Sequence, residues 1–277
     1  MKDFHNHTVN SLDGRQTTEE LVLVAKNNGL SGVAVTEHAE ILFFEEHEAI
    51  KNITNSIKDV NRIKGTCDIK LYQGIEIGSP LEDIEKTKTL MSLCDYDVIL
   101  NSVHFAYHKG KGIKESFASM DYSKYSDEEI KEFLDIYFDG IKDTALDSDF
   151  DVLCHITYPF RYINGRFNRN IDISIYESRV FEIFEILIKR EKSLEINTAS
   201  FGDRYGTKFN CPCPDEYFLK KYYDLGGRYV TLGSDSHRTN DGLSPGHKFD
   251  EVVKILKNIG FDKVTCFEKR KMFFEQI

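Results

Sequence analysis

Short apolar runs alternate with longer helical patterns along the whole of this 277-residue chain. Such strand–helix alternation predicts βαβ units around a parallel sheet, so the fold class is α/β. Seven or eight units of this length predict a closed or nearly closed barrel. The runs that we interpret as strands are 3–7, 32–38, 69–78, 96–105, 151–159, 193–200, 229–237 and 263–269.

The segments between these runs carry helix boundary signals. Thr17 with Glu20, and Ser126 with Glu129, stand in the capping-box relation that begins a helix. Three of the helical segments end in glycine, the residue that most often closes a helix. No low-complexity linker or break in composition divides the chain, so we expect a single domain over residues 1–277.

Charge and hydropathy argue against several classes of partner. The formal net charge of −10 does not fit a nucleic-acid partner, which requires a basic surface. The chain has no apolar window of about 18 residues that would span a membrane, and no secretory signal at its start. The cysteines are scattered, apart from Cys211 and Cys213, and lack the spacing of a zinc site. We therefore expect a cytoplasmic protein with ordinary thiols and without nucleic-acid or membrane partners.

Polar residues stand where the predicted strands end. The interior of a parallel strand in an α/β fold is apolar, and functional groups gather at the carboxyl ends. Glu76 interrupts the apolar stretch "GIEIG", and a carboxylate there is costly to bury without a partner. A single histidine at a strand end is more often structural, but the joint placement predicts a cluster of divalent metal ions at one rim. The residues at these strand ends are His5, His7, His38, Glu76, His104, His155, Asp235 and His237.

The order of these motifs resembles the polymerase-and-histidinol-phosphatase (PHP) family. The matching stretches, in the family's order, are "HNH", "TEH", "GIEIG", "NSVHF", "CHITYP" and "GSDSH", and they span essentially the whole chain. The resemblance implies a distorted (β/α)7, TIM-like barrel with the metal site at its carboxyl-terminal rim, and it leaves the run 263–269 outside the barrel. Within the family, "NSVHF" and the closing stretch 233–271 look most like the monofunctional histidinol-phosphate phosphatases.

Carried over position by position, the resemblance implies three divalent metal ions. The first would be bound by His5, His7, Glu76 and Asp235, the second by Glu76, His104 and His155, and the third by Asp13, His38 and His237. Some relatives carry histidine where this chain has Asp13, so its third position is richer in oxygen. Imidazole and carboxylate ligands suit zinc, manganese or iron(II) and do not choose among them. Glu37, in "TEH", is expected beside the ligands and not among them.

The implied reaction is the hydrolysis of L-histidinol phosphate to L-histidinol and phosphate in histidine biosynthesis. Two metal ions about 3.5–4 Å apart can bridge a hydroxide that attacks phosphorus, so no phosphoenzyme is required. Glu76 would bridge the two ions. Asp13 and His237 are candidates to protonate the leaving alkoxide.

A phosphate monoester also favours a guanidinium group, which can bind two oxygens at once. Arg161 and Arg204 follow the fifth and sixth strands, and the resemblance supports arginines in these loops as phosphate-binding residues. Arg166 is a reserve, and Asn197 either contacts the substrate or caps its loop. The sequence does not single out the groups that bind the imidazole and ammonium of the substrate. The candidates are Phe105, Tyr107, Glu115 and Tyr158.

Two other interpretations remain open. A phosphoesterase of the same fold could act on a nucleotide or on phosphotyrosine, and a metal-binding module of this fold could lack turnover. All nine expected ligand positions are filled in this sequence, which favours an enzyme over a module that has lost ligands.

Overall fold

A parallel barrel forms the centre of the protein, as seen in a computed structural model that describes residues 1–201, 210–239 and 244–277. Within these residues seven strands follow one another in the order β1-β2-β4-β5-β8-β9-β10, and every ladder between them is parallel. Between β10 and β1 the amide of Phe4 donates to the carbonyl of Leu232 over 3.0 Å, and the amide of His7 donates to that of Ser236 over 2.8 Å. The predicted (β/α)7 barrel is thereby confirmed. Its strands are β1 Lys2–Asp3, β2 Gly32–Val35, β4 Lys70–Gly78, β5 Val98–Ser102, β8 Val152–Leu153, β9 Ser193–Asn197 and β10 Val230–Gly233, with β3 His38–Glu40 paired to β4.

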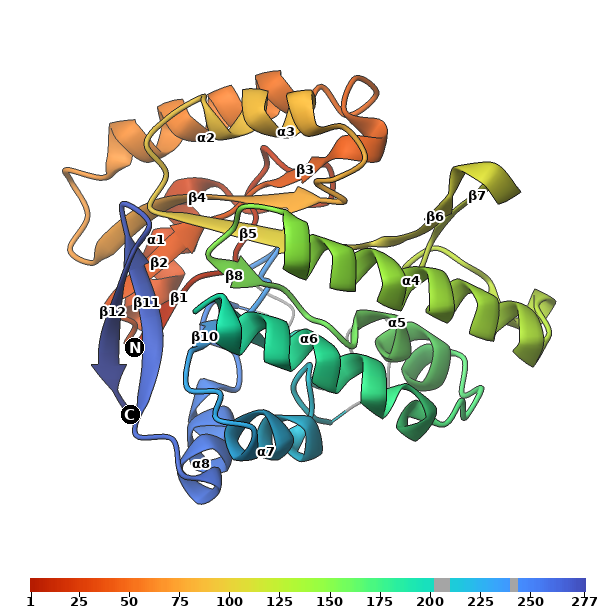
Figure 1. Ribbon diagram of the computed structural model, residues 1–277. Helices are drawn as coiled ribbons and strands as arrows, with labels where there is room; N and C mark the ends of the chain where they lie inside the picture. The colour runs from red at the N-terminus through yellow and green to blue at the C-terminus, as the bar shows by residue number, and fades with distance from the viewer. Residues whose placement is uncertain (202–209, 240–243) are drawn as a thin grey trace.

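Helices surround these strands, as Figure 1 shows. Both predicted capping boxes are present, one between Thr17 and Glu20 and the other between Ser126 and Glu129. Gly29 follows the first helix with a φ of +76°, a conformation that glycine adopts without steric cost. The long helices are α1 Thr18–Asn27, α2 Ala49–Ile63, α3 Ile84–Met91, α4 Asp127–Asp147, α6 Glu177–Lys189, α7 Glu216–Asp224 and α8 Phe249–Ile259. Short helical turns are η1 Ile41–Phe43, η2 Lys109–Lys111, η3 Tyr122–Lys124, α5 Tyr158–Phe160, η4 Arg161–Arg166 and η5 Ile173–Tyr176.

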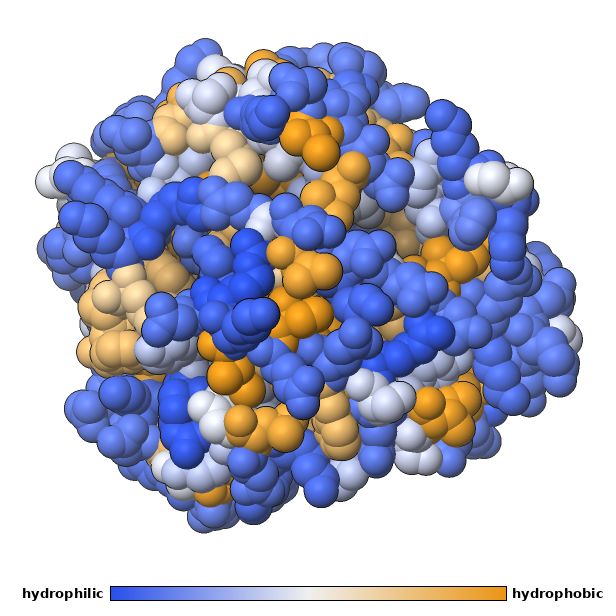
Figure 2. All heavy atoms as spheres, viewed as in Figure 1, coloured by the Kyte–Doolittle hydropathy of each residue, from blue (hydrophilic) through white to orange (hydrophobic). Residues whose placement is uncertain are grey.

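Apolar side chains fill the space between the barrel and its helices. The largest buried rings include Tyr122, Tyr137 and Phe184. The face shown in Figure 2 is mostly hydrophilic, with separate small apolar patches. None of the helices in the described part of the chain is long and apolar enough to cross a membrane.

Most strands are shorter than the predicted apolar runs, and two of the runs contain other structure after the strand ends. The run 96–105 divides, because β5 ends at Ser102 and a hairpin of β6 (Phe105–His108) and β7 (Ile113–Ser116) begins beyond His104. The run 151–159 contains only the two residues of β8, because His155 has a φ of +26° and a helical turn begins at Tyr158. His104 and His155 therefore lie just after the ends of β5 and β8. At these positions the backbone has left the sheet, at the rim of the barrel.

The last apolar run lies outside the barrel, in the position that the family resemblance implied. It forms an antiparallel hairpin of β11 (Lys263–Glu268) and β12 (Lys271–Gln276). The guanidinium of Arg270 donates to Asp149 over 2.8 and 2.9 Å and to Asp151 over 3.0 Å, at the amino ends of the strands. The amino group of Met1 lies 3.2 Å from the carboxylate of Glu275. The hairpin and both chain ends are thus attached to the amino-terminal rim of the barrel (Figure 1).

Candidate metal centre

Glu76 lies at the centre of the carboxyl-terminal rim, where its side chain is fully buried. Its Oε2 is 3.3 Å from Nε2 of His5 and 3.6 Å from Nε2 of His7. Its Oε1 is 3.3 Å from Nε2 of His104 and 3.2 Å from Nε2 of His155. Each oxygen of this carboxylate therefore faces a different pair of imidazoles, which is the arrangement expected of a bridging ligand.

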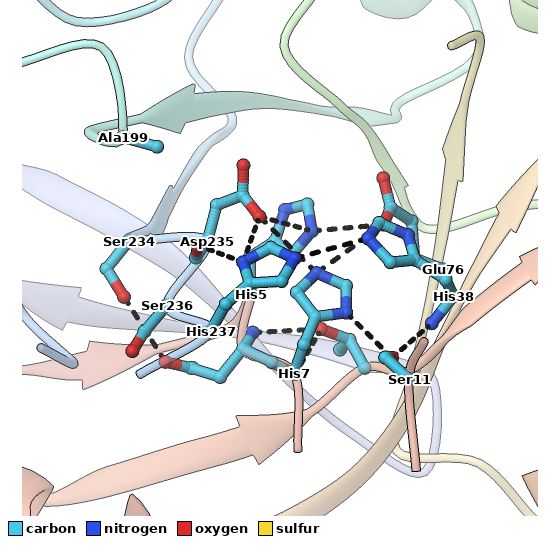
Figure 3. Close-up of polar contacts among 12 residues, drawn as sticks. His5, His7, Ser11, His38, Glu76, Ala199, Ser234, Asp235, Ser236 and His237 are labelled. Atoms are coloured by element: carbon cyan, nitrogen blue, oxygen red, sulfur yellow. Dashed lines mark hydrogen bonds and ion pairs between the residues drawn. The ribbon is translucent and has the colours of Figure 1, made fainter. Parts of the chain in front are cut away.

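Asp235 faces the first of these pairs from the opposite side. Its Oδ1 lies 3.4 Å from Nε2 of His7 and 3.8 Å from Nε2 of His5. Figure 3 shows these side chains pointing toward one another from separate parts of the barrel. His5, His7, Asp235 and Glu76, the four residues predicted around one metal ion, are therefore gathered in one place.

Asp13, His38 and His237 form a third group at the mouth of the site. Nε2 of His38 lies 3.7 Å from Oδ1 of Asp13, and Nε2 of His237 lies 3.2 Å from Oδ2 of Asp13. Nδ1 of His38 is also 2.7 Å from Oε2 of Glu76, so His38 links this group to the buried one. The Asp13 side chain is 57% exposed, which makes it the most accessible of the nine residues predicted to bind metal.

Local backbone geometry explains how His5 and His7 come to share a face. Side chains two apart on an extended chain point to the same side. The intervening Asn6 points the other way, where its Nδ2 donates to the carbonyl of Ala34 over 3.2 Å. Asn6 therefore ties the end of β1 to β2 while both imidazoles face the barrel axis.

The donor atoms of this cluster suit a divalent cation. Nε2 of His5, Nε2 of His7 and Oε2 of Glu76 are buried and make no hydrogen bond with acceptable geometry to any described residue. These three atoms converge, so a single cation between them could bind all three. Closely spaced ligand atoms also occur in the groups His5–His7–Asp235, Glu76–His104–His155 and His7–His38–His237. The structure thus holds clustered histidine, glutamate and aspartate groups of the kind that bind metal ions.

Imidazoles and carboxylates shift one another's pKa values at this site. Burial alone would raise the pKa of Glu76, but His5, His38 and His104 hold it well below its usual range. Burial opposes the charged form of His38, yet Glu76 and Asp13 outweigh it and raise the pKa of His38 to about 9. The pKa of His7, in contrast, is held well below its usual value by burial and by the neighbouring His38 and His237. Metal binding must displace such protons, because a metal ligand has to be deprotonated.

A cleft of about 360 Å³ opens above the cluster. Asp13, His38, His104, Asp235 and His237 line it, together with Arg161 and Arg166.

Arg161, predicted to bind phosphate from the loop after the fifth strand, is buried beside the cluster. Its side chain is only 3% exposed. Nη2 donates to Oδ1 of Asn197 over 2.9 Å, Nε donates to Oγ of Ser200 over 3.0 Å, and Nη1 lies 3.6 Å from Oδ2 of Asp235. The burial follows from the helical turn that begins at Tyr158 and carries Arg161 inward. Arg204 lies outside the described residues.

Two carboxylates at the site were missed by the sequence interpretation. Nδ1 of His5 lies 2.5 Å from Oε1 of Glu195, and Nδ1 of His104 is hydrogen-bonded to Glu40. Glu195 interrupts the apolar strand "SLEIN" as Glu76 interrupts "GIEIG", so the criterion that selected Glu76 could have selected it too. Glu37, expected near the ligands, accepts a hydrogen bond from Oγ of Ser11.

Several known proteins are similar to this chain over most of its length. A "probable histidinol-phosphatase" of Clostridium acetobutylicum is 28% identical over 271 residues, which cover 98% of each chain. The crystal structure of histidinol phosphate phosphatase from Lactococcus lactis, complexed with zinc, L-histidinol and phosphate, has a TM-score of 0.70 at 25% identity, over 98% of each chain. A putative histidinol phosphatase of Listeria monocytogenes shares the fold, with a TM-score of 0.67 at 20% identity over 86% of this chain and 95% of the other.

The sequence model of the PHP domain matches residues 3–199. This segment begins at the second residue of β1 and extends past β9, so it covers six of the seven barrel strands. The seventh, β10, which precedes Asp235 and His237, follows it. Because the match extends over well more than half of the sequence, this chain belongs to the PHP-domain family.

Proposed function

We propose that this protein is a histidinol-phosphatase, which hydrolyses L-histidinol phosphate to L-histidinol and phosphate in histidine biosynthesis. The observation that carries the proposal is the carboxylate of Glu76, which stands between two pairs of imidazoles beneath an open cleft. The full-length similarity to the Clostridium and Lactococcus proteins supports the choice of substrate.

Three divalent metal ions, zinc, manganese or iron(II), would occupy the positions implied by the family resemblance. The first would be bound by His5, His7, Glu76 and Asp235, the second by Glu76, His104 and His155, and the third by Asp13, His38 and His237. When bound, such ions polarise a phosphoryl oxygen and lower the pKa of water to near neutrality. Nε2 of His5, Nε2 of His7 and Oε2 of Glu76, which are buried without a hydrogen bond to any described residue, converge on the first position and support its assignment.

The remaining roles belong to residues at the cleft. Arg161 holds the phosphoryl group through its guanidinium, and Asn197 orients that guanidinium by accepting from Nη2. Asp13 and His237 lie 3.2 Å apart on the wall of the cleft and are the candidates to protonate the leaving alkoxide, a role that either can fill only while it is not bound to the third ion.

Residues 1–277 act as one catalytic domain in this proposal. His5 and His237 come from opposite ends of the sequence, and both lie near Oδ1 of Asp235, at 3.8 and 3.5 Å. A segment that lacked either end would lack part of the site.

A panel of phosphate esters tests the choice of substrate. We expect metal-loaded protein to turn over L-histidinol phosphate with a higher kcat/KM than a nucleoside monophosphate or phosphotyrosine. Equal or faster hydrolysis of the nucleotide or of phosphotyrosine would assign the protein to another phosphoesterase activity. Stoichiometric metal binding with no turnover of any ester would identify a non-catalytic metal-binding module.

Replacement of Arg161 by methionine should weaken substrate binding without loss of metal. A charge-assisted hydrogen bond contributes about 1.5–3 kcal/mol, so kcat/KM for L-histidinol phosphate should fall about 10- to 150-fold. Metal content, measured by elemental analysis, should stay at the wild-type level. Arg169→Met is the matched control, because Arg169 donates to the carbonyl of Tyr125 and to Asp127 and does not line the cleft. Unchanged kcat/KM in Arg161→Met would exclude Arg161 from phosphate binding and direct attention to Arg166 or Arg204.

A further inference from the structure

Two of the predicted metal-binding imidazoles rest on buried carboxylates that are not among the nine predicted ligands. Oε1 of Glu195 lies 2.5 Å from Nδ1 of His5, and Oε1 of Glu40 is hydrogen-bonded to Nδ1 of His104. The side chains of Glu195 and Glu40 are both buried. In each case the far nitrogen of the imidazole, Nε2, is the one that faces Glu76.

Glycines make room for both carboxylates. A Cβ atom at Gly233 would lie 2.3 Å from Oε1 of Glu195 and 2.7 Å from Cβ of His5, and one at Gly78 would lie 2.2 Å from Oε2 of Glu40. All three distances are shorter than real Cβ atoms show, so any larger residue would displace the carboxylate or the backbone. Gly78 stands two residues after Glu76 on β4, and Gly233 ends β10 two residues before Asp235. The strand that carries Glu76 and the strand that leads into Asp235 therefore also provide the space for the supporting carboxylates.

A carboxylate at Nδ1 fixes which nitrogen of a neutral imidazole carries the proton. The Nδ1–H group donates to the carboxylate, and the lone pair remains on Nε2. Such a partner also fixes the orientation of the ring and makes Nε2 a stronger ligand. For His5 and His104 this directs the lone pairs toward the two oxygens of Glu76.

Glu195 contacts two of the predicted metal-binding histidines, His5 and His155, whereas Glu40 is hydrogen-bonded to His104 alone. Oε2 of Glu195 accepts from the backbone amide of His155 over 2.8 Å, and His155 holds a φ of +26°. Glu195 therefore contacts one residue from each of the two groups around Glu76, whereas the contact from Glu40 is to the second group alone.

We propose that Glu195 and Glu40 are positioning residues of the metal centre, which orient the imidazoles of His5 and His104. Gly233 and Gly78 lack a side chain and so leave the space that these two carboxylates occupy. This inference rests on the proposed metal binding but not on the identity of the substrate. Glu195 would support both metal positions that share Glu76, whereas Glu40 would support only one of them.

Zinc affinity of the glutamine variants tests the proposal without any assay of activity. Metal-free protein is titrated with zinc in competition with a chromophoric chelator. Loss of a partner to a metal-binding histidine typically weakens metal binding about 10- to 100-fold. We expect a loss of this size for two zinc ions in Glu195→Gln and for one in Glu40→Gln. Asp97→Asn is the control: Asp97 is equally buried, accepts from the amide of Gln73 at the opposite rim, and should leave zinc affinity unchanged.

A spectroscopic measurement separates positioning from a general loss of stability. In zinc-loaded wild-type protein, the Nδ1–H of His5 should give an exchange-protected, downfield imidazole proton signal, and this signal should be lost or shifted upfield in Glu195→Gln. Gly78→Ala should reproduce the weaker zinc binding of Glu40→Gln, since the three atoms nearest to its Cβ would all belong to the Glu40 carboxylate. If Glu195→Gln fails to fold, the test is the zinc affinity of Glu40→Gln, in which one ion should bind more weakly.

Two results would overturn the positioning role. One is wild-type zinc affinity in folded Glu195→Gln and Glu40→Gln proteins, and the other is an equal loss in Asp97→Asn. A wild-type protein that binds zinc tightly but hydrolyses no phosphate ester would contradict the proposed function, while the positioning role would still be decided by the zinc titrations.

Discussion

Glu76→Gln is expected to abolish nearly all phosphatase activity and to reduce the metal content by more than one ion. The two oxygens of Glu76 face different imidazole pairs, so one substitution disturbs both groups. An amide is neutral, and its NH2 group would point donor hydrogens at one of the pairs. We expect kcat/KM to fall by several orders of magnitude, with metal content measured by elemental analysis of the same sample.

Asp151→Asn provides the comparison for Glu76→Gln. Asp151 is also a buried carboxylate at a strand, but it accepts from the amide of Ile99 and from Arg270 at the opposite rim. This variant should lose stability and keep its metal. Near-normal kcat/KM and a full metal complement in Glu76→Gln would show that Glu76 is only a buried structural carboxylate.

Removal of the metal ions is expected to reduce hydrolysis of L-histidinol phosphate to background. Zinc or manganese added back should restore the activity. Stability should fall in parallel, because bound ions stabilise the folded state by about 4 kcal/mol when free metal exceeds Kd 1,000-fold. For a protein of this size that corresponds to a decrease in Tm on the order of 10 °C, measurable by thermal denaturation monitored with circular dichroism.

The far-ultraviolet spectrum before heating is the control for metal removal, since it shows whether the chelated protein is still folded at the assay temperature. Full activity in folded protein that contains no metal by elemental analysis would exclude a metal-dependent mechanism.

The barrel and the cluster of polar strand ends could be predicted because both are local patterns. Capping boxes mark helix starts, and residues such as His5 and His7 reach a common rim once the strands are parallel. The side chain of Glu76 was distinctive because an apolar strand rarely contains a carboxylate.

The supporting contacts could not be predicted in the same way, because they depend on which strands become neighbours. Glu195 meets His5 across 190 residues of sequence, and Glu40 meets His104 across 64. The burial of Arg161 likewise depends on a helical turn where the apolar run suggested a strand. A continuous apolar run also does not reveal where the backbone leaves the sheet. In β5 the backbone leaves the sheet after Ser102, although the apolar run continues.

The attachment of both chain ends to the amino-terminal rim has a practical consequence. The amide of Ile277 donates to the carbonyl of Asp262 over 3.0 Å, and Met1 is held by Glu275 beside it, while the cleft opens among the strand ends at the carboxyl-terminal rim. An affinity tag or a surface linker joined to either end would therefore extend away from the substrate entrance. The protein can be immobilised through either end on a sensor surface or resin with its cleft still facing the solution.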